Sequence, residues 1–249
     1  MILVPVIGLV LGALVGSFLA TVLLRWPAGR SALAGRSHCD ACDRALGPAD
    51  LVPLLSFAWH RGRCRTCRAP IDRTHLAVEI IAAAIGGFAF AAASPPAALA
   101  WAVLGWGLLL LAAFDWRYFW LSDMLTLSLA ALGLILGQVI HAAPLVDRLI
   151  GAAAGYGVLW LVARAYRSLR HREGMGGGDP KLLAAIGAWL GWQALPFVLL
   201  AASSLGLLLA AIASARGRPM SATTALPLGT LLCLAALPGW FGARALGIG

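Results

Sequence analysis

Eight long apolar runs constrain the fold of this 249-residue chain more than any other feature of its sequence. Hydrophobic residues make up 61% of the chain and charged residues only 12%, so a water-soluble fold would have to bury several helix-length apolar runs. A helix needs roughly 17–25 apolar residues to cross a bilayer, and most of these runs qualify. We therefore expect an all-α polytopic membrane protein with about eight transmembrane helices, or seven if the short sixth run merges with the seventh. The runs are residues 2–24, 76–93, 97–114, 124–140, 149–165, 182–192, 195–215 and 222–241.

The basic residues predict how these helices are oriented. If the N-terminus lies outside, one side of the membrane receives all but two of the 19 Lys and Arg residues. Cytoplasmic loops are enriched in Lys and Arg, so we expect this side to be the cytoplasm. Because the basic residues cluster in loops, the net charge of +9 reflects membrane topology, and no nucleic-acid partner is expected. The loops concerned are residues 25–75, 115–123, 164–181 and 216–221, while Arg148 and Arg244 fall on the other side.

Two features of the runs bear on their packing. The first run has no basic segment before it and no small-x-small cleavage site after it, so we expect a retained helix rather than a cleaved signal peptide. Small residues four positions apart allow helix backbones to approach closely in lipid, which predicts packing seams in four places. These are Gly8, Gly12 and Gly16; Gly133 and Gly137; Gly151 and Gly155; and Gly187 and Gly191.

The loop at residues 25–75 carries two CxxC motifs about twenty residues apart, formed by Cys39, Cys42, Cys64 and Cys67. This spacing is typical of a tetrahedral four-cysteine zinc site, and cytoplasmic thiols stay reduced. Four thiolates complete the coordination of the metal, so we expect a structural zinc. It would stabilise a loop that is too small to form a hydrophobic core of its own. A redox CxxC motif and unligated thiols remain as alternatives, and Cys233 is expected to be a buried small residue.

Two aspartates flank apolar runs on the predicted cytoplasmic side. Asp115 follows the third run, and Asp179 precedes the sixth run after a glycine-rich segment at residues 174–178. A carboxylate beside hydrocarbon is costly to keep ionised, so such residues are functional candidates. Asp179 and Pro180 also suit a helix start, but capping explains neither the glycines nor a second aspartate on the same side. The pair suggests a membrane aspartic protease.

Two other acidic residues leave alternatives open. Asp123 starts the next helix and could be the partner aspartate instead of Asp115, although a helix-capping role is the simpler interpretation. Glu79 lies near the cytoplasmic start of the second run, where it could serve a site or pair with an arginine. No dinucleotide fingerprint, Walker A loop, HExxH or GxSxG motif offers a competing chemistry.

Several segments together resemble a known family from one end of the chain to the other. They are Gly16-Ser-Phe-Leu19 with Arg25-Trp-Pro27, Arg36-Ser-His-Cys39 through Cys67-Arg-Ala-Pro-Ile71, Glu79, Arg172-Glu-Gly-Met-Gly176, Gly178-Asp179-Pro-Lys181, and Gly187-Ala-Trp-Leu-Gly191. The chain resembles the bacterial type IV prepilin peptidases, bifunctional leader peptidases and N-methyltransferases among the GxGD aspartic proteases. It departs from their pattern at Leu121-Ser-Asp123, where Leu-Pro-Asp is usual, and at Pro180, where an apolar or aromatic residue is usual.

The resemblance implies an aspartic endopeptidase in which Asp115 and Asp179 form the catalytic pair, while Asp123 matches an aspartate that the family does not use in catalysis. Neighbouring carboxyls at a low-dielectric edge share a proton, so one activates water and the other protonates the peptide carbonyl. The resemblance also implies a substrate-facing set of residues, namely Gly176, Gly177, Gly178, Lys181 and Glu79.

The resemblance further implies the substrates and the location. The substrates would be precursors of type IV pilins or type II secretion pseudopilins, whose basic leader is cleaved after a glycine at the cytoplasmic membrane edge. The new N-terminal residue would then be methylated with S-adenosylmethionine, although no pattern shows where this donor binds. The protein would sit as a multi-pass chain in the lipid of the bacterial inner membrane, with its active site facing the cytoplasm.

The expected organisation has three segments. Residues 1–24 form the first transmembrane helix, residues 25–75 the cytoplasmic zinc-binding domain, and residues 76–249 the helical protease core. One alternative is a monofunctional preflagellin-type leader peptidase, against which the cysteine domain argues. The others are a non-catalytic membrane transporter, for which inverted repeats and midplane charges would be needed and are not seen, and a zinc-ribbon scaffold.

Overall fold

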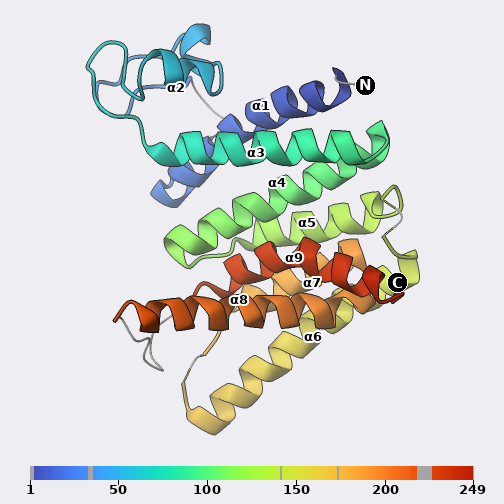
Figure 1. Ribbon diagram of the computed structural model, residues 1–249. Coiled ribbons are helices and arrows are strands. Elements are labelled where there is room, and N and C mark those ends of the chain that lie inside the picture. Colours follow the sequence, from blue (N-terminus) through green and yellow to red (C-terminus); the bar gives the residue numbers. More distant parts are fainter. Residues whose placement is uncertain (1–2, 33–35, 141, 173, 218–225, 249) are drawn as a thin grey trace. The chain divides into compact units, whose positions relative to one another are not determined.

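The computed structural model describes residues 3–32, 36–140, 142–172, 174–217 and 226–248 (Figure 1). Glu173 and residues 218–225, which belong to segments discussed above, lie outside these ranges. The chain forms two compact units, Met1–Leu110 and Leu111–Gly249. The division into three segments stays a prediction.

The described residues form helices and turns, and no strand longer than an isolated bridge occurs among them. Eight helices correspond in order to the eight apolar runs, and one short helix, α2, lies in the cysteine-containing loop. The first unit contains α1 (Leu3–Arg25), α2 (Leu55–Trp59) and α3 (Arg73–Ala92), and α4 (Pro95–Tyr118) extends from it into the second. The second unit contains α5 (Asp123–Leu136), α6 (Leu145–Arg170), α7 (Asp179–Leu190), α8 (Leu195–Ala215) and α9 (Leu228–Ala245).

Six of the described helices are long and apolar enough to cross a membrane, namely α1, α3, α4, α6, α8 and α9. The other two helices that match apolar runs, α5 and α7, have 14 and 12 residues. The sixth and seventh runs do not merge, because Gly191 adopts a φ of 86° that ends α7, and a short turn at Trp192–Ala194 precedes α8. The structure therefore confirms an all-α polytopic membrane protein with a helix count close to the one expected.

In the first unit, α1 lies along α3 through the predicted glycine seam (Figure 1). A Cβ atom at Gly12 would lie 2.8 Å from the Cα of Ala83, and one at Gly16 would lie 2.8 Å from the Cα of Glu79. Both distances are too short for a side chain, so glycine is required for this close packing. The indole of Trp106 on α4 donates a 2.9 Å hydrogen bond to the carbonyl of Ala82.

In the second unit, α7 is enclosed by protein. Nearly every residue from Asp179 to Leu190 is buried, and α7 contacts α5, α6, α8 and α9. Gly155 on α6 allows the backbone of Leu183 to approach, since a Cβ there would lie 2.6 Å from the Leu183 carbonyl oxygen. The Trp189 indole donates a 2.8 Å hydrogen bond to the Leu129 carbonyl on α5. Neighbouring helices thus surround α7 in place of lipid, so a helix of only 12 residues can be accommodated within the membrane part of the protein.

The end of α5 is held by a buried arginine. Arg148, near the start of α6, is fully buried and donates hydrogen bonds to the carbonyls of Gly133 and Leu134 at 2.8 and 3.1 Å. It also donates to the side chain of Gln138 at 3.0 Å. The last carbonyls of a helix lack intrahelical partners, and the guanidinium supplies donors to carbonyls near the end of α5. Its position just before the fifth apolar run suggested an exposed charge in a loop. The structure shows instead that Arg148 is buried.

We predict that Arg148→Met will destabilise the protein by about 2–4 kcal/mol, because it removes the buried guanidinium that donates to the Gly133 and Leu134 carbonyls and to the Gln138 side chain. The measurement is thermal unfolding of purified protein in one detergent. Arg170→Met is the matched control, since Arg170 is exposed at the end of the same helix and should change stability by no more than about 0.5 kcal/mol. Equal losses in the two variants would contradict a capping role for Arg148.

Candidate functional site

Asp115 lies in the last turns of α4, and only 6% of its surface is exposed. Its Oδ2 accepts a 2.6 Å hydrogen bond from the backbone N–H of Thr230 and lies 3.0 Å from the Thr230 hydroxyl. That hydroxyl is also 3.1 Å from the carbonyl of Ala112, so its single proton serves one of the two oxygens. Asp115 is thus fixed by a residue 115 positions later in the chain.

The start of α9 explains this contact. Thr230 lies in the first turn of α9, where backbone N–H groups have no intrahelical acceptor and the helix dipole favours negative charge. Gly229 allows the approach, because a Cβ atom there would lie 3.0 Å from Cγ of Asp115. Thr230 was not predicted from the sequence. The available signal was the helix-start sequence Pro227-Leu-Gly-Thr230, which points to a helix N-terminus but not to its partner.

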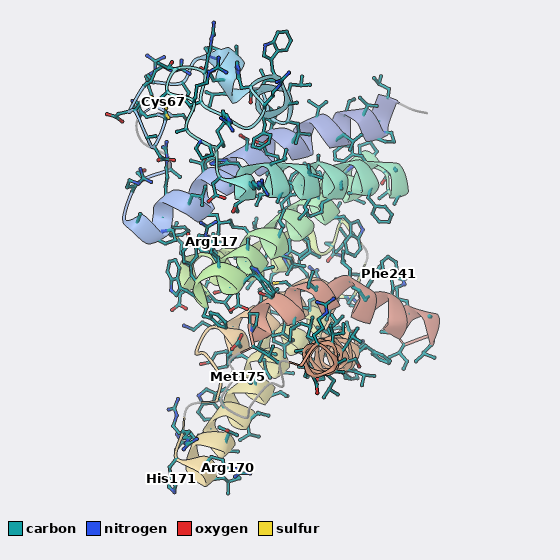
Figure 2. All side chains as sticks on the ribbon, turned by 60° about the vertical axis from the view of Figure 1, so that its left-hand side comes forward. Cys67, Arg117, Arg170, His171, Met175 and Phe241 are labelled. Carbon is teal, nitrogen blue, oxygen red and sulfur yellow. The ribbon has the colours of Figure 1, made fainter. Side chains whose placement is uncertain are left out.

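Asp179 is the first residue of α7 and is also 6% exposed. Its Oδ2 accepts a 3.1 Å hydrogen bond from the N–H of Gly176, so the glycine segment folds back onto its own aspartate. Pro180 occupies the first helical turn, as expected for a helix start. Figure 2 shows Met175 in this segment, which follows the end of α6 at Arg170 and His171.

The structure brings Asp115 and Asp179 together within the second unit. Their carboxyls are close enough to interact electrostatically. Leu121 lies beside both, because its side chain would meet a Cβ at Gly178 at 2.6 Å and one at Gly229 at 2.8 Å. The surroundings of the two carboxyls are buried and mostly apolar. Ionising both of two neighbouring buried carboxyls is unfavourable, because like charges repel strongly in low-dielectric surroundings.

Cys233 on α9 also lies near the two carboxyls. It is buried and lies within electrostatic range of both Asp115 and Asp179. Its burial agrees with the sequence-based expectation, but its position beside the two carboxyls was not foreseen.

Lys181 and Asp123 form an ion pair that links the starts of α7 and α5. The Lys181 ammonium lies 2.6 Å from both carboxylate oxygens of Asp123. Asp123 is exposed and occupies the first turn of α5 after Ser122, so it is engaged with Lys181 and makes no direct hydrogen bond to Asp115 or Asp179 among the described residues.

The three glycines before Asp179 differ in their surroundings. At Gly178 a side chain would collide with Leu121, whereas a Cβ at Gly177 would meet open space. A Cβ at Gly176 would lie 3.4 Å from Oδ2 of Asp179. Steric exclusion therefore requires glycine most clearly at Gly178.

Glu79 lies in the first unit, on α3, with 7% of its surface exposed. Its Oε2 accepts a 2.9 Å hydrogen bond from the N–H of Leu54 in the cysteine-containing loop. It forms no ion pair with an arginine among the described residues, so of the two roles considered from sequence the arginine pair is not observed.

The four cysteines of the first unit converge. The sulfurs of Cys39, Cys42, Cys64 and Cys67 all lie within 4.8 Å of one another, and Cys39 and Cys67 are 3.8 Å apart. An ion bonded at about 2.3 Å to four tetrahedral sulfurs would separate them by about 3.8 Å. Figure 2 marks Cys67 in the loop between α1 and α3. The cluster therefore has the ligand set and spacing of a metal site.

The two CxxC motifs repeat one backbone geometry. In the first, the N–H of Cys39 donates to the carbonyl of Arg44 and the N–H of Asp43 to the carbonyl of Cys39. In the second, Cys64 donates to Ala69 and Arg68 donates to Cys64 in the same register. Asp43 and Arg68 both take a left-handed conformation, with φ of 54° and 60°. Such a conformation is uncommon outside glycine, and its recurrence shows that both turns are shaped to present sulfurs to one point.

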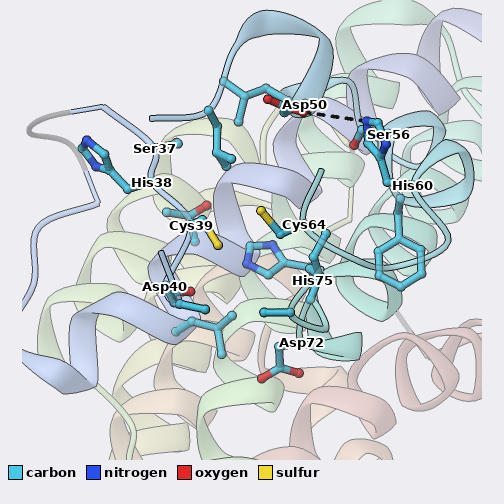
Figure 3. Close-up of a pocket in the computed structure, with 18 of the residues that line it drawn as sticks. Ser37, His38, Cys39, Asp40, Asp50, Ser56, His60, Cys64, Asp72 and His75 are labelled. Atoms are coloured by element: carbon cyan, nitrogen blue, oxygen red, sulfur yellow. Dashed lines mark ion pairs between the residues drawn. The ribbon is translucent and has the colours of Figure 1, made fainter. Parts of the chain in front are cut away.

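Polar groups around Cys64 favour its metal-binding form. Backbone N–H groups of Cys67 and Thr66 point to its sulfur and lower the pKa of the thiol to about 6. Arg44 also interacts with this sulfur and pairs with Asp50 at 2.9 Å. The pKa of the Asp50 carboxyl (Figure 3) is held below its usual range, mainly by the hydrogen bond from the Gly47 N–H and also by the Arg44 guanidinium. These contacts orient the second cysteine motif around the cluster.

Comparisons with known proteins agree with this architecture. Residues 102–211 match the model of the type IV leader peptidase family, and residues 10–93 match the bacterial peptidase A24 N-terminal domain. Similar proteins, each named prepilin leader peptidase/N-methyltransferase, occur in Burkholderia pseudomallei (39% identity, covering 90% of this chain and 81% of the relative) and Pseudomonas aeruginosa (36%, covering 93% and 87%).

A protein of the same name from Aeromonas hydrophila is 45% identical over 69% of this chain, but the match spans only 59% of that relative's length. No solved structure matches the chain. The family models cover both units, and the Burkholderia and Pseudomonas relatives align over nearly the whole sequence. The chain therefore belongs to the type IV leader peptidase family.

Proposed function

We propose that this protein is a membrane aspartic endopeptidase that removes the basic leader of type IV prepilins or type II secretion pseudopilins and then methylates the new N-terminal residue. The observation that carries the peptidase half is the pair of buried, interacting carboxyls at Asp115 and Asp179. The methyltransferase half rests on the relatives, whose names include both activities. This favours the bifunctional enzyme over the monofunctional alternative.

The proposed hydrolysis uses the carboxyl pair as one acid–base device. The ionised member takes a proton from a water molecule, whose oxygen attacks the scissile carbonyl, while the protonated member donates its proton to the carbonyl oxygen. Collapse of the tetrahedral intermediate then releases the amine, and no acyl-enzyme forms. The two carboxyls titrate as a unit, so the roles of acid and base belong to the pair.

Fixed hydrogen bonds support this device. Thr230 holds Asp115 from the start of α9, and Gly176 holds Asp179 from the glycine segment. Each carboxyl keeps one oxygen, Oδ1, outside these hydrogen bonds. Catalytic groups that are held in place before substrate binds need less reorganisation in the transition state.

The proposed location is the bacterial inner membrane with the carboxyl pair on the cytoplasmic side. Asp115 lies near the end of α4 and Asp179 at the start of α7, so both occupy helix ends rather than helix centres. The basic residues of the loops support this orientation, because the positive-inside rule favours Lys and Arg on the cytoplasmic side. A precursor with a basic cytoplasmic leader and an apolar helix would present its scissile bond at that depth.

We predict that Asp115→Asn and Asp179→Asn will each lower leader cleavage by about 10²–10⁴-fold, since each removes half of the acid–base device. The assay is conversion of a purified precursor, with product N-termini read by mass spectrometry. Asp123→Asn is the control and should retain substantial activity, because the amide oxygen still accepts a hydrogen bond from Lys181. Full cleavage by the Asp115 variant would reject the assignment and favour Asp123.

The ion pair between Asp123 and Lys181 is proposed to position α7 and its glycine segment. We predict that Asp123→Lys alone will lower cleavage by about tenfold, because two ammonium groups at the starts of α5 and α7 repel each other. Combining it with Lys181→Asp restores the attraction and should recover most of the lost rate. If the double variant is no better than the worse single variant, Lys181 acts through a direct contact with substrate instead.

The metal of the four-cysteine cluster is proposed to be zinc. Cys39, Cys42, Cys64 and Cys67 would hold it with a closed tetrahedral shell, which suits a structural role and leaves no position for catalytic water. The metal would contribute the folding energy of a loop whose described residues form turns, two short 3-10 helices and the five-residue α2.

We predict about one zinc ion per chain in protein purified under reducing conditions, as measured by elemental analysis. Replacing Cys39 and Cys42 together with serine should release the zinc and make the loop sensitive to limited proteolysis. Cys233→Ala is the control, because that cysteine is not in the cluster and the zinc should remain. Zinc-free protein with a protease-resistant loop would contradict the structural role.

A further inference from the structure

Five consecutive exposed residues follow Asp115 directly, and four of them are aromatic. They are Trp116, Tyr118, Phe119 and Trp120, and the fifth is Arg117, which Figure 2 labels near the end of α4. We call residues 116–120 the aromatic segment. Trp116 and Phe119 are the most exposed of its rings, at 65% and 58%. Large apolar side chains that are exposed as a contiguous group mark a binding surface or a contact with lipid.

Packing within the second unit holds this segment beside the carboxyl pair. The Trp120 ring meets the Phe114 ring edge-on with 5.5 Å between their centroids, and the Tyr118 ring lies 6.2 Å from the same ring. Phe114 is fully buried and directly precedes Asp115. Phe119 has a φ of 49°, a left-handed conformation that is uncommon outside glycine, and α4 ends just before it. The segment is therefore an ordered surface next to the catalytic pair.

A basic leader meets an electrostatic problem on this side of the protein. All but two of the 19 Lys and Arg residues lie on the predicted cytoplasmic side, so the overall field there repels a cation. Outside the catalytic pair, each carboxylate described in the second unit already has a partner. Asp123 binds Lys181, and Asp147 accepts hydrogen bonds from the side chains of Trp192 and Gln193. Recognition of the leader by a further carboxylate is thus not available among these residues.

Aromatic rings attract cations without carrying a charge of their own, and tryptophan does so most strongly. The segment contains one such contact already, because the Arg117 guanidinium lies 5.8 Å from the centre of the Tyr118 ring. We propose that the aromatic segment binds the cationic side chains of the precursor's leader, mainly through the exposed rings of Trp116 and Phe119. This inference rests on the proposed leader peptidase activity and assigns the surface that reads the leader's charge.

The place of the segment favours the leader over lipid as its occupant. Trp116 is the next residue after Asp115, so their Cα atoms lie about 3.8 Å apart. An extended peptide advances roughly 3.3–3.6 Å per residue, so cations a few residues before the scissile bond come level with the segment when that bond lies at the carboxyl pair. An aromatic anchor for lipid headgroups can lie anywhere on the membrane edge, whereas a leader-binding surface must lie near the catalytic residues.

The test measures whether the segment and the leader's charge act together. Full-length enzyme in lipid nanodiscs cleaves two purified precursors, one with its native leader and one in which each leader Lys or Arg is replaced by Gln. Steady-state rates give KM and kcat separately. We expect Trp116→Leu to raise KM for the native precursor by about fivefold to tenfold, with kcat changed by less than about twofold. With the neutral precursor the same variant should match the wild type.

Two further variants separate attraction of cations from apolar contact. Trp116→Glu replaces the ring with a carboxylate, so it should retain the preference for the native leader that Trp116→Leu loses. Phe119→Leu should raise KM for the native precursor less than Trp116→Leu, because phenylalanine attracts cations more weakly than tryptophan. The control is Trp160→Leu on α6, since Trp160 is similarly exposed but lies outside the segment, and its KM should not change. Thermal unfolding shows whether each variant is folded, and Phe119→Leu decides the question if Trp116→Leu is not.

Several outcomes would overturn the proposal. Equal losses with the native and the neutral precursor would show that the segment contacts lipid or an apolar part of the substrate. Poorer cleavage of the native precursor by Trp116→Glu than by Trp116→Leu would show the same, and a loss confined to kcat would show an effect on the catalytic pair. A wild-type KM that does not depend on leader charge would leave nothing for the segment to read. Absence of cleavage of both precursors by the wild type would instead count against the proposed peptidase itself.

Discussion

The enclosure of α7 is the constraint on which the second unit depends. A 12-residue helix cannot cross a bilayer, so it is stable at membrane depth only if neighbouring helices surround it and satisfy its polar groups. Gly155 lets α6 approach its backbone, and the Trp189 indole fixes it to α5. Because α7 is enclosed, its first residue, Asp179, is enclosed as well. The same packing that allows a short helix therefore buries a carboxyl at its end.

Asp115 is buried as well, but different elements of the fold support it. It ends a long apolar helix, and the start of α9 supplies the N–H that holds it. A helix N-terminus offers unsatisfied donors and a favourable dipole, which makes burial of a carboxylate tolerable. Two buried carboxyls supported by different elements thus lie close enough to interact electrostatically. Acid–base hydrolysis is the chemistry that such an arrangement supports best.

The first unit contains a loop that must be stabilised in another way. Its loop is too small to bury a core, and the two cysteine turns bring four sulfurs to one point by repeating the same hydrogen bonds. The fold around this cluster leaves a cavity (Figure 3) that is lined in part by the buried Glu79, whose Oε2 accepts a hydrogen bond from the N–H of Leu54.

The sequence by itself determined the helical membrane architecture, the four-cysteine cluster and the two candidate aspartates. Apolar run length, motif spacing and charge near hydrocarbon are local signals, so they can be read without a fold. Only the tertiary structure decided that Thr230 holds Asp115, that Lys181 pairs with Asp123, and that Arg148 is a buried cap rather than a loop charge. These partners lie between 14 and 115 positions apart, and a local pattern carries no information about which distant polar groups will be buried together. That choice is made by helix packing, which must give every buried donor and acceptor a partner.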